Sequence, residues 1–209
     1  MKALRLAAIV GAVLLGMLGL HQLVYALMSR GHTSDLPRLG RVPDFAFLSE
    51  RGRPVAARDL EGKAWIADFI FTRCGGTCPA MSERMATLAE TLKDEPGVAF
   101  VSFDVDPEHD SLADLATYSR QHRADPERWT FLRGERPAVR ALAGDGFKLA
   151  IVDGHADDPE PILHSSRFVL VDGRREIRGY YDGLEPGGVE KLAGDARRLA
   201  RDSRPSRAW

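Results

Sequence analysis

The sequence predicts an α/β domain in which a mixed β-sheet carries helices on both faces. Two nearly continuous apolar runs, residues 63–71 and 98–103, have the pattern of strands that are buried on both sides. A segment with apolar residues at helical spacing follows each run. Further along, Asp172-Gly173 between two apolar runs is a strong signal for a hairpin turn. Strands that alternate with helices and then form an antiparallel pair are typical of a mixed sheet.

The first elements of the domain follow from turn and helix signals. Residues 44–48 and 54–56 flank a polar turn that contains glycine, and they predict a short hairpin. After the strand at 63–71, Pro79 suits the first turn of a helix, which Pro96-Gly97 ends. The residues expected on the buried face of this helix are Met81, Met85, Leu88 and Leu92. For the two methionines, core packing is the favoured role over metal ligation.

The second half of the domain is predicted in the same way. Asp110 and Ser111 can both cap the helix that follows the strand at 98–103. The elements expected after it are a strand at 129–132, a helix at 138–143, strands at 147–152, 167–171 and 176–181, and a last helix at 187–201.

Length and composition limit the classes of protein to which this chain can belong. Its 209 residues suffice for one domain with an appendage, and 44% apolar with 28% charged residues is the composition of a globular protein. The formal net charge is −1 with the basic residues dispersed, so no nucleic-acid partner is expected. The predicted parts are a membrane anchor at 1–30, a linker at 31–40, the domain at 41–200 and a charged tail at 201–209.

The anchor is predicted from an uncharged segment near the N-terminus. Residues 6–28 carry no formal charge, and a helix of this length spans the hydrocarbon core of a bilayer, about 30 Å. No good small-x-small cleavage site follows, so we favour an uncleaved anchor over a signal peptide, although residues 6–20 alone are short enough for cleavage. Lys2 and Arg5 precede the span and Arg30 follows it, which places the main domain across the membrane from the cytoplasm.

Cys74 and Cys78 are the only cysteines of the chain and are separated by three residues. They follow the first buried strand, at the carboxyl end where open α/β sheets collect their chemistry. Gly75-Gly76 lets the intervening loop fold back and bring the sulfurs together. Cys78 is predicted at the helix N-cap, and Arg73 adds positive charge; both effects lower the pKa of a thiol. We therefore expect two partly exposed, reactive thiols.

Two thiols alone do not define a metal site. Structural zinc needs four ligands, and the chain has no second cysteine pair. Soft thiolates select Cu(I), which accepts two or three ligands, so one histidine would complete a site. His164, just before a predicted core strand, is a reasonable third ligand, and His109 is a weaker candidate. His32 and His122 are expected in solvent, and His155 is ambiguous.

Three motifs in this order resemble the Sco/SenC family: Phe71-Thr72-x-Cys74-x-x-x-Cys78-Pro79, then Asp104-x-Asp106-Pro107-Glu108-x-Asp110, then His164-Ser165-Ser166 followed by Phe168-Val169-Leu170-Val171-Asp172. The resemblance covers about residues 41–200 and is far more specific than the cysteine pair alone. It implies a thioredoxin-like fold in a membrane-anchored copper protein tied to assembly of the binuclear copper centre of cytochrome c oxidase.

The resemblance implies that Cys74, Cys78 and His164 bind copper, as Cu(I) or Cu(II). It also implies a single-pass metallochaperone of the bacterial inner membrane, with its main domain in the periplasm, that delivers copper to the copper-bearing subunit of cytochrome c oxidase. Other copper chaperones or thiol reductases are further expected partners. Gly75-Gly76-Thr77 departs from the family, where proline and acidic or bulkier residues are common.

A second function stays open for the same thiols. In a thiol–disulfide oxidoreductase, Cys74 would attack and Cys78 resolve, which keeps the cysteines of the target reduced for metal insertion. We favour the metallochaperone; a peroxidase is disfavoured because the chain lacks Pro-x-x-x-Thr-x-x-Cys. Asp68 is either a structural carboxylate or, as in thioredoxin-like oxidoreductases, an acid that assists proton transfer to a thiol. The loop around Asp106 supports the site, docks a partner or caps a helix.

Overall fold

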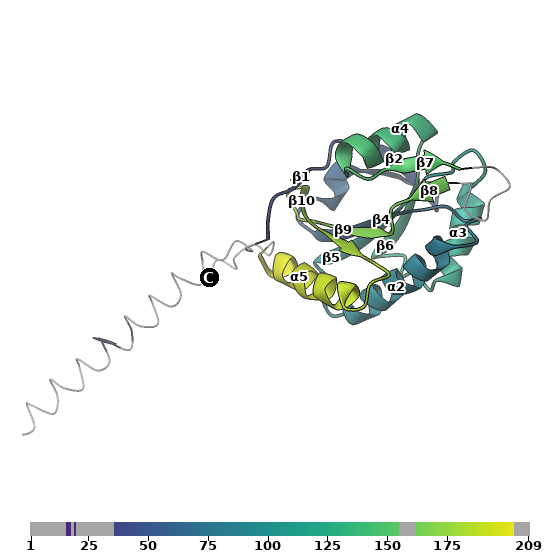
Figure 1. The fold of residues 1–209 in the computed structure, drawn as a ribbon. Helices are drawn as coiled ribbons and strands as arrows, with labels where there is room; N and C mark the ends of the chain where they lie inside the picture. Colours follow the sequence, from purple (N-terminus) through teal and green to yellow (C-terminus); the bar gives the residue numbers. More distant parts are fainter. Residues whose placement is uncertain (1–15, 18, 20–35, 155–161, 203–209) are drawn as a thin grey trace, which may run out of the picture. The chain divides into compact units, whose positions relative to one another are not determined.

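The structure is a computed structural model that describes residues 16, 17, 19, 36–154 and 162–202, with only the backbone of Leu163 and His164 (Figure 1). The chain divides into two compact units, residues 1–35 and 36–209. Nearly all of the predicted anchor, half of the predicted linker and most of the predicted tail lie outside the described residues. Among the residues that are described, no helix is both long and apolar enough to cross a bilayer.

The second unit is built on a mixed sheet, as predicted. In its described part the sheet has eight strands in the order β1-β10-β9-β4-β5-β6-β2-β3. The three central strands β4, β5 and β6 are parallel, and antiparallel strands extend the sheet on both sides. The bounds are β1 (Gly40–Arg41), β2 (Ala46–Ser49), β3 (Pro54–Ala56), β4 (Ala64–Ile70), β5 (Val98–Asp104), β6 (Trp129–Arg133), β9 (Arg167–Val171) and β10 (Glu176–Asp182).

Helices cover both faces of this sheet (Figure 1). They are α2 (Thr77–Thr91), α3 (Leu112–Gln121), α4 (Arg136–Ala141) and α5 (Gly188–Asp202), with a 3-10 turn at Ala57–Leu60. α2 and α5 pack together on one face, and α4 lies on the other (Figure 1). The crossovers β4–α2–β5 and β5–α3–β6 run in the same direction along the sheet, so their right-handed sense places α2 and α3 on one face.

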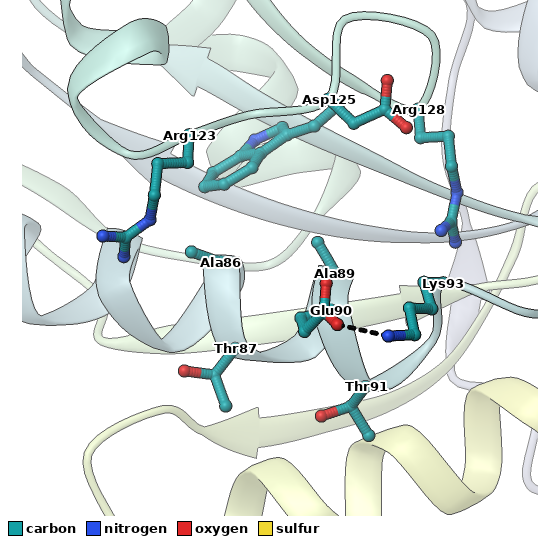
Figure 2. Close-up of a pocket in the computed structure, with 10 residues that line it drawn as sticks. Ala86, Thr87, Ala89, Glu90, Thr91, Lys93, Arg123, Asp125 and Arg128 are labelled. Atoms are coloured by element: carbon teal, nitrogen blue, oxygen red, sulfur yellow. Dashed lines mark hydrogen bonds and ion pairs between the residues drawn. The ribbon is translucent and has the colours of Figure 1, made fainter.

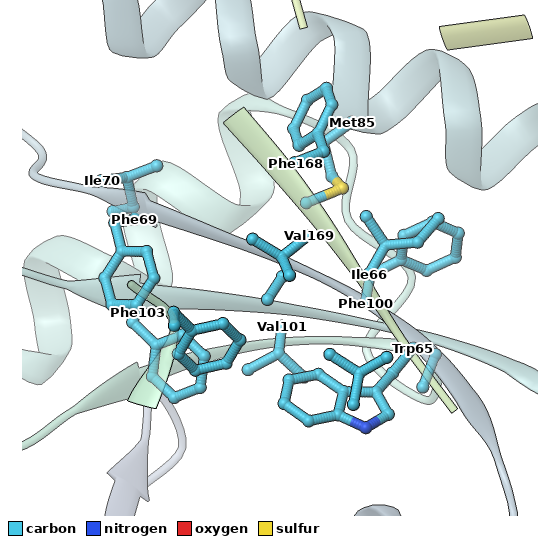
Figure 3. Packing of buried hydrophobic residues seen from close by; sticks show 14 of the residues in the cluster. Trp65, Ile66, Phe69, Ile70, Met85, Phe100, Val101, Phe103, Phe168 and Val169 are labelled. Atoms are coloured by element: carbon cyan, nitrogen blue, oxygen red, sulfur yellow. The ribbon is translucent and has the colours of Figure 1, made fainter. Parts of the chain in front are cut away.

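Alternation along β4 and β5 divides the core into two layers (Figure 3). Trp65, Phe69 and Phe103 point toward the α4 face, where Phe147 packs against all three rings. Ile66 lies on the opposite face, toward α2. Three buried polar residues interrupt that second layer near the carboxyl ends of the strands, namely Asp68, Ser102 and Asp104. The polar end of the layer is therefore the part of the core closest to the cysteines.

Three elements differ from their predicted positions, and one of them is α4, which runs over Arg136–Ala141 where 138–143 was predicted. α2 begins at Thr77 with Gly76 as N-cap, two residues before the predicted start, so Pro79 is its third residue. The strand predicted at 147–152 shortens to β7 (Ile151–Asp153), because a π-helical turn at Leu142–Gly146 precedes it. β7 pairs only with β8 (Ile162–His164) in the part of the chain that is described, and the two form a separate antiparallel ribbon.

Candidate functional site

The cysteine pair lies where β4 ends and α2 begins. Cys74 is in the connecting loop, where its N–H donates to the carbonyl of Phe71 at 3.4 Å. Cys78 is in the first turn of α2, and its N–H donates to Sγ of Cys74 at 3.4 Å. The two thiols are not joined as a disulfide. The structure thus brings the two predicted thiols together at the carboxyl edge of the central strands.

The expectation of two partly exposed thiols was wrong. Cys74 is 7% exposed and Cys78 is fully buried. The hydrogen bond with Cys74 and burial raise the pKa of the Cys78 thiol, and the charge of Asp68 adds to this rise. The physical reason is the early start of α2, which places Cys78 inside the first turn and facing the core instead of at the cap. Gly75 and Gly76, between the thiols, are exposed.

A loop of carboxylates at residues 104–110 holds the backbone that leads into Cys74. Asp110 accepts from the N–H of Thr72 at 2.7 Å and from its hydroxyl at 2.6 Å. Asp106 accepts from the Arg73 guanidinium at 2.7 Å and lies 2.8 Å from Nδ1 of His109. Both carboxylates are buried, whereas the Arg73 and His109 side chains that contact Asp106 are half exposed. Of the roles considered for this loop, the contacts favour support of the site.

The prediction that Asp110 or Ser111 caps α3 is resolved in favour of Ser111. The Ser111 hydroxyl accepts from the N–H of Asp114, and the Asp114 carboxylate accepts from the N–H of Ser111, which forms a reciprocal capping box. Asp110 contacts Thr72 instead. The sequence did not indicate this role, because an aspartate next to a helix start also predicts a helix cap.

Asp104 is a fully buried acid at the end of β5. Its Oδ1 accepts from the N–H of Asp106 at 2.9 Å. Burial raises the pKa of Asp104 to about 8, and the nearby carboxylates of Asp110 and Asp106 contribute to the rise. At neutral pH this side chain is therefore mainly a neutral acid beneath the loop that carries Cys74.

Asp68 lies beneath the cysteines, on the α2 face of β4 and opposite Ser102 of β5. It is 1% exposed, and its charge contributes to the raised pKa values of both the Cys78 thiol and the Tyr118 hydroxyl. Tyr118 in turn forms a 2.8 Å hydrogen bond with Ser82, one helical turn after Cys78. The tyrosine–serine pair has no motif that would have revealed it in the sequence. Whether Asp68 moves protons remains a prediction.

The histidines occupy different surroundings. His164 ends β8 and pairs with Ile151 of β7, but its side chain lies outside what is described, as do His32 and His155. His109 contacts Asp106, as above. His122 was expected in solvent, but it is buried, packs against the Tyr118 ring and contacts Glu83 at 3.0 Å. Among the described side chains no group of three or more metal-binding residues is assembled, so the ligand set stays a prediction.

A pocket of about 470 Å³ opens away from the cysteines, between the middle of α2 and the segment before β6 (Figure 2). The cations that line it are already engaged. Lys93 pairs with Glu90, Arg123 pairs with Glu83, and Arg128 donates to three backbone carbonyls, those of Leu92, Glu95 and Val98. Two of these three cations are thus paired with glutamates, and Arg128 is held in place by backbone carbonyls.

Comparison with known proteins gives one consistent family. The family model described as SCO1/SenC matches residues 36–201. A SCO1 protein homolog of Bacillus subtilis is 31% identical over 158 residues, covering 75% of this chain and 81% of that protein. A mitochondrial SCO2 homolog of Mus musculus is 32% identical over 143 residues, which cover 66% of this chain but only 54% of the mouse protein.

Solved structures agree. A SCO1/SenC family lipoprotein of Bacillus anthracis matches with a TM-score of 0.71 and 31% identity, covering 77% of this chain and 95% of that one. BsSco, described as a member of the Sco family of cytochrome c oxidase assembly proteins with a disulfide switch, matches with the same score and identity over 80% and 96% of the two chains. Copper-bound ScoI of Bradyrhizobium japonicum, at 20% identity and a TM-score of 0.66 over 77% and 99%, shares the fold. These matches confirm the thioredoxin-like fold.

Proposed function

Since the chain belongs to the SCO1/SenC family, we propose that it is a copper metallochaperone that uses Cys74, Cys78 and His164 as ligands. Its cargo is delivered to the copper-bearing subunit of cytochrome c oxidase. Support for this target comes from BsSco, a 31% identical relative that is described as an oxidase assembly protein.

The observation that carries the proposal is the packing of the two thiols. With the Cys78 N–H 3.4 Å from Sγ of Cys74, two soft sulfur donors lie within one turn of chain, which suits Cu(I). Binding copper requires both thiols to lose their protons, so uptake releases protons to solvent. Cys74 is the more accessible of the two, and we expect an incoming thiolate of the partner to compete for copper from the Cys74 side.

A second candidate function is thiol–disulfide exchange. The relative BsSco is described as having a disulfide switch, and the two cysteines here are reduced and lie within one turn of chain. In this reaction the Cys74 thiolate attacks a disulfide of the target and releases one target thiolate. Cys78 then loses its proton and attacks Cys74, which forms the Cys74–Cys78 disulfide and releases the second target thiolate. The target gains two electrons and the pair loses two.

Copper stoichiometry and X-ray absorption spectroscopy of the full-length protein in mild detergent test the first function. Under reducing conditions we expect one Cu(I) with two sulfur ligands and one nitrogen ligand. His164→Ala should lose the nitrogen scatterer and most of the copper affinity, yet retain normal dithiol exchange. Wild-type protein that binds no copper would refute the metallochaperone. Normal oxidase assembly with His164→Ala in cells would favour the oxidoreductase.

We also propose a single-pass protein of the bacterial inner membrane, with residues 1–30 as anchor and the main domain in the periplasm. The uncharged run at 6–28 supports this, and the Bacillus anthracis relative is described as a lipoprotein. Membrane fractionation and protease treatment of spheroplasts test it. We expect the protein in the membrane fraction, with its main domain digested from outside. A soluble periplasmic product would instead demonstrate cleavage.

A further inference from the structure

The ribbon that carries His164 needs an external support. β7 and β8 pair through Ile151–His164 and Asp153–Ile162, and within the described residues neither strand joins the eight-stranded sheet. An isolated two-stranded ribbon is marginally stable in water. Ile162 is buried and fixes one point of β8 in the core. On β7, Ile151 packs against the core, whereas the side chain of Asp153 is held by ion pairs.

Those ion pairs come from α4 and reach two parts of the protein at once. One guanidinium nitrogen of Arg136, Nη2, donates to Asp153 at 2.8 Å, and the other, Nη1, donates to Glu108 at 2.5 Å. Arg140, one turn later, also donates to Asp153. Glu108 belongs to the carboxylate loop, so Arg136 connects the ribbon to that loop. A planar guanidinium can make both contacts in fixed directions, which an ammonium cannot do.

The same loop already holds the cysteine side of the site. Asp110 and Asp106 bind Thr72 and Arg73, the two residues directly before Cys74. The loop itself is fixed from β6, because Arg133 donates to the backbone carbonyls of Pro107 and Asp110. A continuous series of contacts therefore runs from the cysteine loop, through residues 104–110 and Arg136, to the strand paired with β8.

We propose that Arg136 is a positioning residue that sets the place of His164 relative to the cysteine pair. The copper part of this inference rests on the proposed function. Arg136 touches neither thiol, and its exposed fraction is 28%, with 59% for Glu108 and 53% for Asp153. Such pairs add little to global stability. The contribution of Arg136 is therefore to geometry, and its loss should weaken metal binding while the fold persists.

Arg136→Gln in the full-length protein, in mild detergent, tests the inference. Hydrogen exchange of the amides in 151–153 and 162–164 should become faster, with the thermal midpoint of unfolding nearly unchanged. Cu(I) affinity should fall about tenfold, as is usual when a group that orients a metal ligand is removed. Glu108→Ala, which removes only the link to the loop, should lower the affinity in the same direction. Arg123→Gln removes a similar exposed pair with Glu83 elsewhere and is the matched control.

The outcomes separate this inference from the proposed function. If amide hydrogen exchange in β7 and β8 of Arg136→Gln is as slow as in wild type, the positioning role is overturned, regardless of the Cu(I) affinity. Faster exchange with unchanged copper affinity also overturns it, provided that His164→Ala does reduce affinity. If His164→Ala binds copper as wild type does, the proposed ligand set fails, and the exchange rates alone then decide whether Arg136 holds the ribbon.

Discussion

Asp104→Asn is the perturbation for which the structure gives the clearest magnitude. Asp104 is fully buried, and burial raises its pKa from 3.8 to about 8. Asparagine has the shape of the neutral acid, and its side-chain oxygen can still accept the 2.9 Å bond from the N–H of Asp106. The substitution therefore preserves the protonated form and abolishes the titration.

The sign of the effect follows from proton binding. Between pH 3.8 and about 8 the folded chain keeps the Asp104 proton, whereas the unfolded chain has released it. The folded state binds more protons in this window, so the free energy of unfolding falls as pH rises through it. The stabilising contribution is complete below pH 3.8 and is lost as pH rises through the folded pKa. Above that pH the wild type carries a buried charge that the variant does not.

The magnitude is large enough to measure. A rise from 3.8 to about 8 corresponds to roughly 5 to 6 kcal/mol as an upper limit. Neighbouring carboxylates and local relaxation reduce this figure, so between pH 5 and pH 9 the variant should gain about 2 to 5 kcal/mol relative to wild type. Urea unfolding of both proteins in mild detergent, followed by fluorescence of the buried Trp65 and Trp129, measures the difference.

Asp114→Asn provides the control. Asp114 is exposed, and its hydrogen bonds with Ser111 hold the pKa of its carboxyl below the ordinary value. The stabilisation from the Asp114 carboxylate is present above pH 3.8 and is lost only as pH falls through its lower folded pKa. The free energy of unfolding of this variant should therefore differ from that of wild type by a constant amount between pH 5 and pH 9. A difference for Asp104→Asn that is equally flat over that range would refute the account of Asp104 as a buried neutral acid.

Three further predictions concern burial and pairing. Alkylation by iodoacetamide under native conditions should modify Cys74, which is 7% exposed, several times faster than the fully buried Cys78, and peptide mass spectrometry would expose equal rates. Arg178→Met should lower the free energy of unfolding by about 3 to 5 kcal/mol, because it leaves a buried carboxylate partner uncompensated; denaturant titration showing a loss below 1 kcal/mol would contradict this. Asp110→Ala should cost about 1 to 3 kcal/mol and accelerate alkylation of Cys74, since two donors in the preceding loop lose their acceptor; wild-type rates would argue against a positioning role.

The sequence predicts the elements whose signals are local. Buried strands produce uninterrupted apolar runs, which is why β4 and β5 lie within one residue of their predicted bounds. The turn between β9 and β10 was predicted from Asp172-Gly173. In the structure Asp172 accepts from the N–H groups of Arg174 and Glu176, a pattern intrinsic to short polar side chains in turns. The helical spacing of Met81 and Met85 with Leu88 and Leu92 likewise predicts their burial, which the structure confirms.

The features that failed depend on helix phase and on long-range pairing. A shift of two residues in the start of α2 moves Cys78 from an exposed cap into the core, and no local signal fixes a helix boundary that closely. Asp110 and Thr72 are 38 residues apart in the sequence, so their bond is invisible to any local pattern. The pairing of Arg136 with Glu108 and Asp153 is hidden for the same reason. Motif resemblance predicts the ligands, whereas only the fold reveals what holds the cysteine loop and the β7–β8 ribbon.

For the proposed copper site, these contacts bear on how the ion is held and released. The backbone before Cys74 is fixed by buried carboxylates, and Cys78 is fixed by its place in α2. Between them, Gly75 and Gly76 are exposed and have no side chains to anchor. In the proposed function, release of the ion is easier when the two sulfurs can change their separation while the rest of the site keeps its shape. The glycine pair concentrates that freedom in two residues, which is a physical reason for glycine at the positions where the family commonly has larger residues.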